Sequence, residues 1–339
     1  MKALETELRM IDLPAGSTLE TLYLGGGTPS QVPSGRLAGF LERLTSRFPL
    51  ASSAEVTAEA NPEDVTPALL ADWAAAGVNR VSMGVQSFLP LELEILDRRH
   101  SAETAEHSAR QVLEDEHFQL SLDLMLAIPR QHRASLEKSL AKVLEIRPHH
   151  LSVYLLEMDK PHRLQALARR HPDRFASDEE AAGLYLLVHE TLCAAGYEHY
   201  EISNFALPGH RARHNTRYWL HLAVHALGVA AHGHDGNRRW ANLENLDGYV
   251  MAVERGTRPL AWSTVLKPDE LLAEDVLLGL RLARGVAAAR VAEAASTFPG
   301  FAGRLEEFFD LGLAVQAGDT VQLTPRGWLL SNELFQQLV

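Results

Sequence analysis

The chain has 339 residues, 46% of them hydrophobic, and a formal net charge of −12. This acidic balance argues against a protein whose main task is nucleic-acid binding, since such proteins carry a basic footprint. Its single cysteine, Cys193, excludes an internal disulfide framework and any site that needs several thiolates from this chain, and it favours a reducing compartment such as the cytoplasm. No apolar run approaches the ~18 residues of a membrane span, and the first residues lack the apolar core of a signal peptide.

Apolar periodicity predicts that strands and helices alternate through the first two thirds of the chain. Met1, Leu4, Leu8 and Ile11 share one helical face, so a helix is expected from the first residue onward. Strands are expected at residues 19–24, 55–62, 80–88, 120–129, 150–157 and 200–205. Further helices are expected at residues 37–48, 66–77, 89–96, 101–115, 135–144 and 178–195. Because alternating strands and helices build a parallel sheet, the pattern predicts an α/β fold, either an open sheet or an incomplete barrel.

The last part of the chain follows a different pattern. A helix at 269–283, a turn at 317–319 between two short apolar runs, and a helix at 325–338 are expected. This order predicts a small winged-helix-like domain at residues 247–339, after a first domain at residues 1–246. Folds of this kind often bind DNA, but Glu306, Glu307 and Asp310 and the absence of a basic stripe argue against that here.

Polar residues follow the apolar part of each expected strand. The first strand ends in the glycine turn Gly25-Gly26-Gly27-Thr28, where a ligand can approach the backbone closely, although glycine is equally the default wherever φ is positive. The other strands end in Glu59 and Asn61, Gln86 and Ser87, Asp123, Glu157, and Glu201 and Asn204. Because ligands of parallel α/β folds bind at the carboxyl ends of the strands, this rim is the candidate site.

Several motifs occur in a fixed order: GGGTPS, EANPE, GVQSF, RRH, a strand with Asp123, HLSVY, YEISNFA and HNTRYW. This order resembles the radical S-adenosylmethionine (SAM) family of the oxygen-independent coproporphyrinogen III oxidases and their HemW heme-chaperone relatives, over nearly the whole chain. The resemblance implies an incomplete (β/α)6 TIM-like barrel with a small C-terminal helical, winged-helix-like domain. It also implies S-adenosyl-L-methionine on the carboxyl rim, beside a [4Fe–4S] cluster in the full-length family.

The resemblance assigns SAM contacts to residues of the rim. The matching positions are Gly25, Gly26, Gly27, Thr28, Glu59, Gln86, Arg98 and Asp123. The glycine turn would meet the amino-acid end of SAM with backbone groups, and Gln86 would lie near that moiety. Glu59 would accept hydrogen bonds from the ribose hydroxyls, and Arg98 would pair with the SAM carboxylate. Without the resemblance, Glu59 is interpreted as an exposed strand end and Arg98 as a surface charge, whereas Asp123 needs a partner in its apolar strand.

The segment HNTRYW (214–219) resembles the HNxxYW element that is linked to heme binding in HemW proteins. The resemblance implies His214 as an iron ligand, with Tyr218 and Trp219 packing on the porphyrin. Because the segment follows the carboxyl end of the expected sixth strand, it is expected on the rim side of the barrel. Candidate partners for the heme propionates are Arg211, Arg213 and Arg217, and competing iron ligands are His210, His221, His225 and His232. Without the resemblance, a structural histidine and a core Tyr–Trp pair would be the favoured interpretation.

The sequence departs from the family in its defining element. Radical SAM proteins hold their cluster with a C-x3-C-x2-C loop, whereas this chain begins within the first helix and has only Cys193. Two explanations stay open: an incomplete chain that lacks its first barrel strand, or a natural member without a cluster. The incomplete chain is favoured, because loss of the first strand would leave an unpaired sheet edge, which proteins usually avoid exposing. Lesser departures are Ala127-Ile128-Pro129-Arg130-Gln131 in place of G-L-P-G-Q, and residues 228–232 in place of a longer glycine-rich loop.

We therefore expect a HemW-like heme chaperone that binds heme and passes it to an acceptor protein. As it stands, the chain should lack radical chemistry, because it has no cysteines for the cluster. The first alternative is a coproporphyrinogen III dehydrogenase, a radical SAM enzyme of porphyrin biosynthesis. Further alternatives are a SAM- or tetrapyrrole-binding module without a transfer role and an acid–base enzyme that uses Glu59 and Asp123. Neither a nucleic acid nor a membrane is an expected partner.

Overall fold

The computed structural model describes residues 1–14, 16–158 and 164–338. The chain divides into two compact units. Unit 1 comprises Met1–Gly26, Val32–Glu55 and Arg213–Val339, and unit 2 comprises Gly27–Gln31 and Val56–Ala212. The domain boundary that we predict between residues 246 and 247 stays a prediction.

The core of unit 2 is a row of parallel strands. They are the end of β2 (Leu50–Ala60), β3 (Arg80–Gln86), β4 (Gln119–Leu126) and β5 (His150–Leu155), all close to their predicted places. In β4 the leucines at positions 120, 122, 124 and 126 are buried, and Ser121, Asp123 and Met125 alternate with them. Because side chains alternate across a strand, Asp123 lies on the face opposite the leucines.

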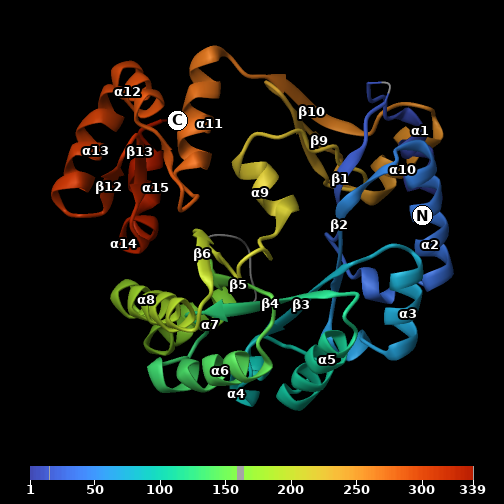
Figure 1. Ribbon diagram of the computed structural model, residues 1–339, viewed down its shortest axis with the longest axis horizontal. Helices are drawn as coiled ribbons and strands as arrows, with labels where there is room; N and C mark the ends of the chain where they lie inside the picture. The colour runs from blue at the N-terminus through green and yellow to red at the C-terminus, as the bar shows by residue number, and fades with distance from the viewer. Residues whose placement is uncertain (15, 159–163, 339) are drawn as a thin grey trace. The chain divides into compact units, whose positions relative to one another are not determined.

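Helices connect these strands and cover one face of them. They are α3 (Pro67–Ala75), α4 (Pro90–Ile95), α5 (Ala102–Glu114), α6 (Arg133–Ile146) and α8 (Asp178–Ala194), with the short α7 (Leu164–Arg170) and η3 (Pro172–Arg174) before α8. Figure 1 shows α5, α6 and α8 together on one side of β3 to β5. Side chains cap the starts of α3 and α5, as expected from helices that begin near residues 66 and 101: Thr66 Oγ1 accepts from Leu69 N at 3.1 Å, and Ser101 Oγ accepts from Thr104 N at 3.2 Å.

The sixth strand differs from the prediction. Instead of one parallel strand at 200–205, the chain forms an antiparallel hairpin of β6 (Glu198–Glu201) and β7 (Asn204–Ala206). Glu201 Oε2 accepts from Ser203 N at 3.2 Å, a local side chain–backbone bond of the kind that favours a turn. β7 pairs antiparallel with β5, with Ala206 opposite His150. The chain therefore leaves the hairpin at the amino end of β5, and our reason for placing His214 on the carboxyl rim is wrong.

Unit 1 begins with α1 (Lys2–Met10), β1 (Leu19–Leu24), α2 (Ser34–Arg47) and the first part of β2. Leu19 N donates to Pro49 O at 2.8 Å, beside the start of β2. In the strand order of the whole sheet, β1-β2-β3-β4-β5-β7-β6, β1 is an edge strand. After the hairpin come α9 (Arg213–Trp219), β8 (His232–Asp235), β9 (Arg238–Asn242), α10 (Leu246–Glu254) and β10 (Leu260–Val265). The strands β8, β9 and β10 form a separate sheet in the order β10-β9-β8.

The buried carboxylate of Glu7 ties α1 to the later part of unit 1. It accepts from Asn242 Nδ2 at 2.6 Å, from Gly228 N at 2.9 Å and from the Tyr249 hydroxyl at 2.5 Å. A buried carboxylate is tolerated when its oxygens receive such bonds. The first helix is therefore an integral part of unit 1.

The end of unit 1 has the winged-helix-like order that we predict. It contains α11 (Pro268–Gly279), β11 (Val286–Ala287), α12 (Ala288–Thr297), α13 (Pro299–Asp310), β12 (Ala314–Ala317), β13 (Thr320–Leu323), α14 (Pro325–Leu329) and α15 (Ser331–Phe335). The strands pair in the order β11-β13-β12. The single helix expected at 325–338 is instead two short helices that meet at Leu330.

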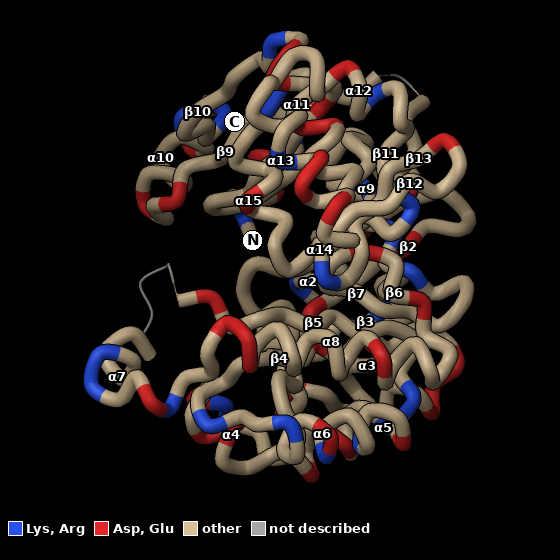
Figure 2. Tube along the Cα trace, turned by 90° about the vertical axis from the view of Figure 1, so that its left-hand side faces the viewer, with Lys and Arg blue, Asp and Glu red and all other residues tan. Residues whose placement is uncertain are grey.

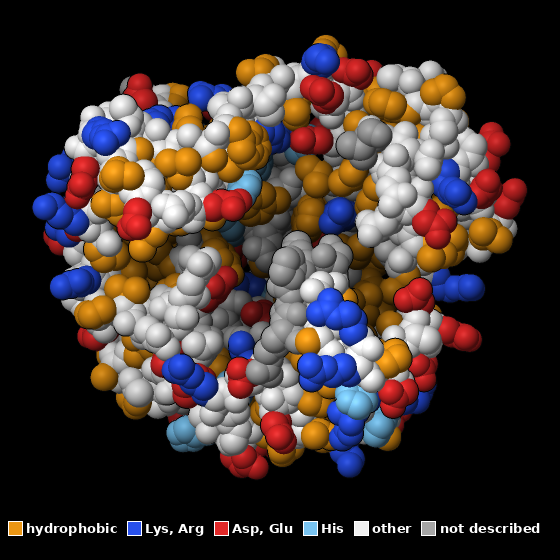
Figure 3. Space-filling model, turned by 180° about the vertical axis from the view of Figure 1, so that it is seen from behind, with side chains coloured by type: hydrophobic (Ala, Val, Ile, Leu, Met, Phe, Trp, Pro, Cys, Tyr) orange, Lys and Arg blue, Asp and Glu red, His pale blue; other side chains and the backbone are white. Residues whose placement is uncertain are grey.

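Charged residues of both signs are distributed along the helices, as Figure 2 shows for α12 and its neighbours. Hydrophobic side chains also reach the surface, and on the face shown in Figure 3 they lie among charged ones. No helix in the described part of the chain is long and apolar enough to cross a membrane.

Candidate functional site

The first candidate site lies at the carboxyl ends of β2, β3 and β4 in unit 2. Glu59 is opposite Ser82 in the register of β2 and β3, and Asp123 is opposite Ser152 in that of β4 and β5. The carboxyl group of Asp123 hydrogen-bonds to both serines. Burial raises the pKa of Asp123 to about 7, and the charge of Glu59 adds to this effect, while the two serines and Arg98 oppose it. A carboxyl group that titrates near neutrality is typical of a functional site.

Arg98 and Gln86 meet at Gly84 of β3. Arg98 Nη2 donates to Gly84 O at 2.6 Å, and a Cβ on Gly84 would lie 2.8 Å from that nitrogen and 3.3 Å from Gln86 Nε2. Burial lowers the pKa of Arg98, and the charges of Glu63 and Asp123 oppose this effect. Gln86 has a left-handed backbone (φ 69°), and its buried Oε1 has no hydrogen-bond partner in the part of the chain that the structure describes. A ligand with a donor group would satisfy this acceptor.

These contacts bring four predicted residues together, namely Glu59, Gln86, Arg98 and Asp123. The sequence analysis missed Gly84, Ser82 and Ser152. A single glycine inside an expected strand, as in GVQSF, is the signal that indicates Gly84, because such a glycine often marks a close approach.

The glycine turn is exposed. Gly26 has φ +77°, which accounts for glycine there. A Cβ on Gly26 or Gly27 would meet no other heavy atom of the described residues within 4 Å, apart from its chain neighbours. Protein packing therefore does not require these glycines. Gly27 and Thr28 belong to unit 2, with the strand-end cluster, whereas Gly25 and Gly26 belong to unit 1.

The second candidate site, in unit 1, is built around α9. The N–H groups of Arg213 and His214 donate to Glu55 Oε2 and Oε1 at 3.0 and 2.9 Å, so one carboxylate from β2 caps the start of this helix. His214 Nδ1 lies 2.9 Å from Thr21 Oγ1, and its ring stacks on Tyr23 with 5.2 Å between centroids. Two residues of β1 thus fix the orientation of the imidazole.

The imidazole of His214 is neutral at physiological pH. Burial lowers its pKa to about 4, and the positive charge of Arg217 acts in the same direction. Because Thr21 contacts Nδ1, Nε2 is the ring nitrogen left for another partner. A neutral, oriented imidazole is the form that ligates metals.

Tyr218 and Trp219 differ in their surroundings. The ring of Tyr218 is 5.6 Å from that of His214, and the residue is 37% exposed. Trp219 is less exposed, with the Arg281 guanidinium 5.3 Å from its ring centroid. Tyr218 therefore offers an open aromatic surface beside His214, whereas Trp219 is largely packed.

The three predicted propionate partners already have protein partners. Arg211 pairs with Glu198 at 2.9 Å and Arg217 with Glu20 at 2.6 Å, while Arg213 donates to Ser53 O. A heme carboxylate would have to replace these exposed interactions, each of which contributes little to stability.

His234 is a further candidate that the sequence analysis missed. It is buried in β8, and its ring is 5.6 Å from that of Tyr218. Burial lowers its pKa to about 4, with the charge of Arg239 as the next cause. Its Nε2 has no hydrogen-bond partner among the described residues. The alternation of His232 and His234 in an expected apolar context would have been the only sequence signal.

The predicted competitors of His214 have other surroundings. His210 packs on His149, and His225 lies near Trp240. The ring nitrogens of His221 lie 3.2 and 2.8 Å from carboxylate oxygens of Glu274 and Asp275, and His232 Nδ1 hydrogen-bonds to Ala230 O. His232 is exposed, and its ring lies 6.1 Å from that of Trp262, which makes it a suitable control.

The residues of this chain do not fit a [4Fe–4S] cluster. Such a cluster takes three or four thiolates, and the chain has one, Cys193 on α8. Within residues 1–14, 16–158 and 164–338, no group of three His, Cys, Asp or Glu side chains could hold a metal ion.

Comparison with known proteins gives a consistent result. A family model described as the HemN C-terminal domain matches residues 266–330. The heme chaperone HemW of Mycobacterium tuberculosis (strain CDC 1551 / Oshkosh) is 36% identical over 99% of this chain and 85% of its own length. The heme chaperone HemW of Bacillus subtilis (strain 168) is 31% identical over 99% of this chain and 89% of its own length. These relatives favour the chaperone interpretation over the dehydrogenase.

Among solved structures, the coproporphyrinogen III oxidase HemN from Escherichia coli, a radical SAM enzyme, has a TM-score of 0.82 at 22% identity. The match covers 99% of this chain and 82% of the oxidase. At this identity the likeness shows the fold. The predicted partial radical SAM barrel with a small C-terminal domain is confirmed.

Proposed function

The chain belongs to the HemW family of radical SAM proteins, and on this premise we propose that it binds heme through His214 and passes it to an acceptor protein. The observation that carries the proposal is the setting of His214, a neutral imidazole held by Thr21 and Tyr23 beside the exposed ring of Tyr218. We place this activity in the cytoplasm, which the single cysteine favours.

The surroundings of His214 suit reversible ligation. When bound, heme would supply an iron with axial positions for protein ligands. Nε2 of His214 is the nitrogen that would reach the iron, because Thr21 holds Nδ1. A histidine whose pKa is about 4 needs no deprotonation before it binds at neutral pH. Tyr218 would cover part of the apolar porphyrin face, as aromatic rings do.

Weak propionate contacts fit a protein that gives up its ligand. Arg217 is paired with Glu20, so a propionate that binds Arg217 would gain only the difference in free energy between two exposed ion pairs. Heme would then depend mainly on the iron–histidine bond and on apolar contact. Exchange of that one bond would release it to an acceptor.

Titration of the folded apoprotein with hemin, followed by the Soret band, tests the proposal. We expect saturable binding by the wild type and at least a tenfold weaker affinity with a changed Soret band for His214→Ala. His232→Ala is the matched control, because its ring is exposed and bonded to the backbone, and it should leave both unchanged.

His234→Ala separates the ligand assignment from the function. Lost binding in this variant with unchanged binding in His214→Ala would move the iron ligand to His234 while heme binding stands. Absence of saturable binding in the folded wild type would overturn the proposed function altogether.

We also propose that the strand-end cluster of unit 2 binds SAM. The ammonium group of SAM would satisfy the unpartnered Oε1 of Gln86, and its carboxylate would pair with Arg98. The ribose hydroxyls would donate to Glu59, and Gly27 and Thr28 of unit 2 would offer backbone groups. Because a cluster iron would normally hold the amino and carboxylate groups, we expect weak binding. Calorimetry with SAM should show weak binding by the wild type and none by Arg98→Ala. Equal affinities of the two proteins for SAM would contradict the assignment.

A further inference from the structure

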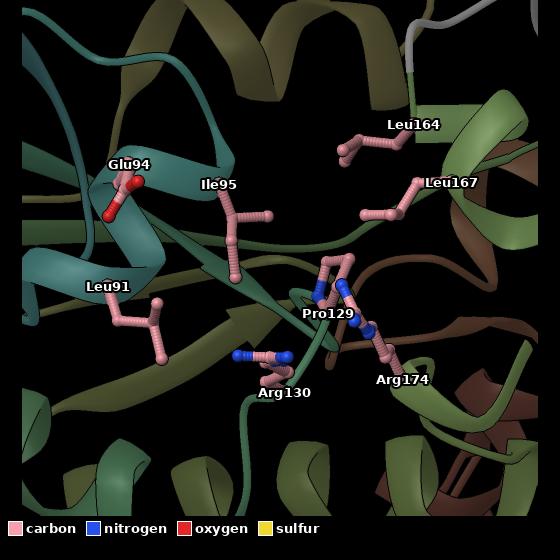
Figure 4. A pocket seen from close by; sticks show the side chains of 8 residues that line it. All are labelled: Leu91, Glu94, Ile95, Pro129, Arg130, Leu164, Leu167 and Arg174. Atoms are coloured by element: carbon pink, nitrogen blue, oxygen red, sulfur yellow. The ribbon is translucent and has the colours of Figure 1, made fainter. Parts of the chain in front are cut away.

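Unit 2 contains a pocket of about 440 Å³ beyond the carboxyl end of β4. Its walls come from α4, from the segment after β4, from α7 and from η3 (Figure 4). Most of the lining is apolar, and its polar side chains are Arg130, Arg174 and Glu94. This volume lies within the usual range of small-molecule sites, roughly 300–1,000 Å³.

Two arginines without an acidic partner lie at one end of the pocket. Arg130 N donates to Arg174 O at 2.7 Å, and Figure 4 shows both side chains beside Pro129. No salt bridge joins either guanidinium group to a carboxylate in the described part of the chain. Glu94 lies on the far side of the pocket in the same view. In a chain with 44 acidic and 32 basic residues, two adjacent unpaired arginines favour an anionic partner.

The backbone beside the pocket is strained. Arg130 has φ 69° and Ala127 has φ 57°, which is a left-handed backbone conformation that residues other than glycine rarely adopt. These are the two positions at which the chain carries another residue in place of the glycines of G-L-P-G-Q. A glycine at position 130 would relieve the strain, yet the chain carries an arginine whose side chain lines the pocket. Strain retained in this way indicates a functional role for the side chain.

We propose that the pocket binds an apolar molecule that carries a carboxylate. The carboxylate would lie on Arg130 and Arg174, and the apolar body would pack against Leu91, Ile95 and Leu167. A fatty acid and the propionate edge of a porphyrin both have this chemistry. The site uses none of the residues around His214, so it stands independently of heme ligation.

Calorimetry with two probes tests the proposal, namely decanoate and metal-free protoporphyrin IX, which has no iron for His214 to ligate. Decanol is the uncharged control for the apolar chain. We expect one of the two carboxylates to bind saturably, and decanol to bind at least tenfold more weakly. Binding by decanoate would identify an acyl chain as the apolar body, and binding by the porphyrin alone would identify a propionate edge.

Substitutions distinguish the arginine from the strain. Arg130→Gly removes both and should weaken binding at least tenfold while the melting temperature is unchanged or higher. Ala127→Gly relieves the neighbouring strain without removing a charge, and it should bind as the wild type does. Arg174→Gln should lose binding as Arg130→Gly does. The proposal is overturned if neither carboxylate binds the wild type, if decanol binds equally well, or if binding survives in Arg130→Gly.

Discussion

Burial shifts the pKa values of Asp123 and His214 in opposite directions for the same reason. Asp123 becomes harder to ionise, with a pKa of about 7, and His214 becomes harder to protonate, with a pKa of about 4. In both cases the charged form loses solvation. At physiological pH His214 is therefore neutral, whereas Asp123 is only partly ionised.

The raised pKa of Asp123 makes stability depend on pH. Its ordinary value is 3.8, so between about pH 4 and pH 7 the folded state binds more protons than the unfolded state, and this contribution to stability is lost as the pH rises. Asp123→Asn cannot ionise. At pH 8 it should be more stable than the wild type by about 2–4 kcal/mol, and the gain should shrink toward pH 4.5.

Urea unfolding at pH 4.5 and pH 8 would measure this difference. Asp72→Asn is the matched control, because Asp72 is exposed on α3, and its effect should be small at both pH values. A gain in Asp123→Asn that does not change with pH would contradict the raised pKa.

The hydroxyl of Thr21 should affect heme binding without contacting heme. Thr21→Val keeps the shape of the side chain but removes the bond to His214 Nδ1. Loss of such an orienting partner typically weakens metal ligation 10–100-fold. Hemin titration should show a weaker affinity and an altered Soret band in Thr21→Val, but not in Thr18→Val, whose side chain is exposed just before β1. An unchanged spectrum would rule out an orienting role.

At the scale of elements, α9 is a helix of seven residues that depends on its surroundings. Helices this short are unstable alone in water. Glu55 supplies two acceptors to its first N–H groups, and Glu55→Gln would leave only one oxygen for them. We expect a loss of about 1–3 kcal/mol in the free energy of unfolding, with weaker heme binding.

Glu20→Gln is the control for that substitution, since Glu20 also contacts α9 but through an exposed ion pair with Arg217. Glu20→Gln should lower the free energy of unfolding by less than about 1 kcal/mol. Urea unfolding and hemin titration would measure both variants. Equal losses in the two would show that the buried cap has no special role.

At the scale of the whole molecule, the chain has too few thiols for an iron–sulfur cluster. Anaerobic reconstitution with iron and sulfide should leave far less than one [4Fe–4S] cluster per chain, because one cysteine cannot replace three. Iron and sulfide analysis after desalting would measure the yield, and Cys193→Ser is the control for adventitious iron. A stoichiometric cluster with the absorbance of a [4Fe–4S] protein would refute this prediction.

The sequence by itself determined the order of the elements and the family. Alternating apolar runs located β1 to β5 and most helices, and Thr66 and Ser101 marked helix starts, since these signals depend on neighbours in the chain. The motifs also named residues that the structure brings together, such as Arg98 and Asp123.

Only the tertiary structure decided the surroundings of those residues. Thr21 and His214 are 193 positions apart, and no local pattern predicts their contact. The same holds for the cap that Glu55 provides, for the place of His234 beside Tyr218, and for the two arginines at the pocket. The hairpin of β6 and β7 was missed because residues 200–205 fit one continuous strand in the sequence, whereas pairing with β5 fixes the direction of β7. Local sequence selects the elements, and packing between distant segments sets the charge and orientation on which the chemistry depends.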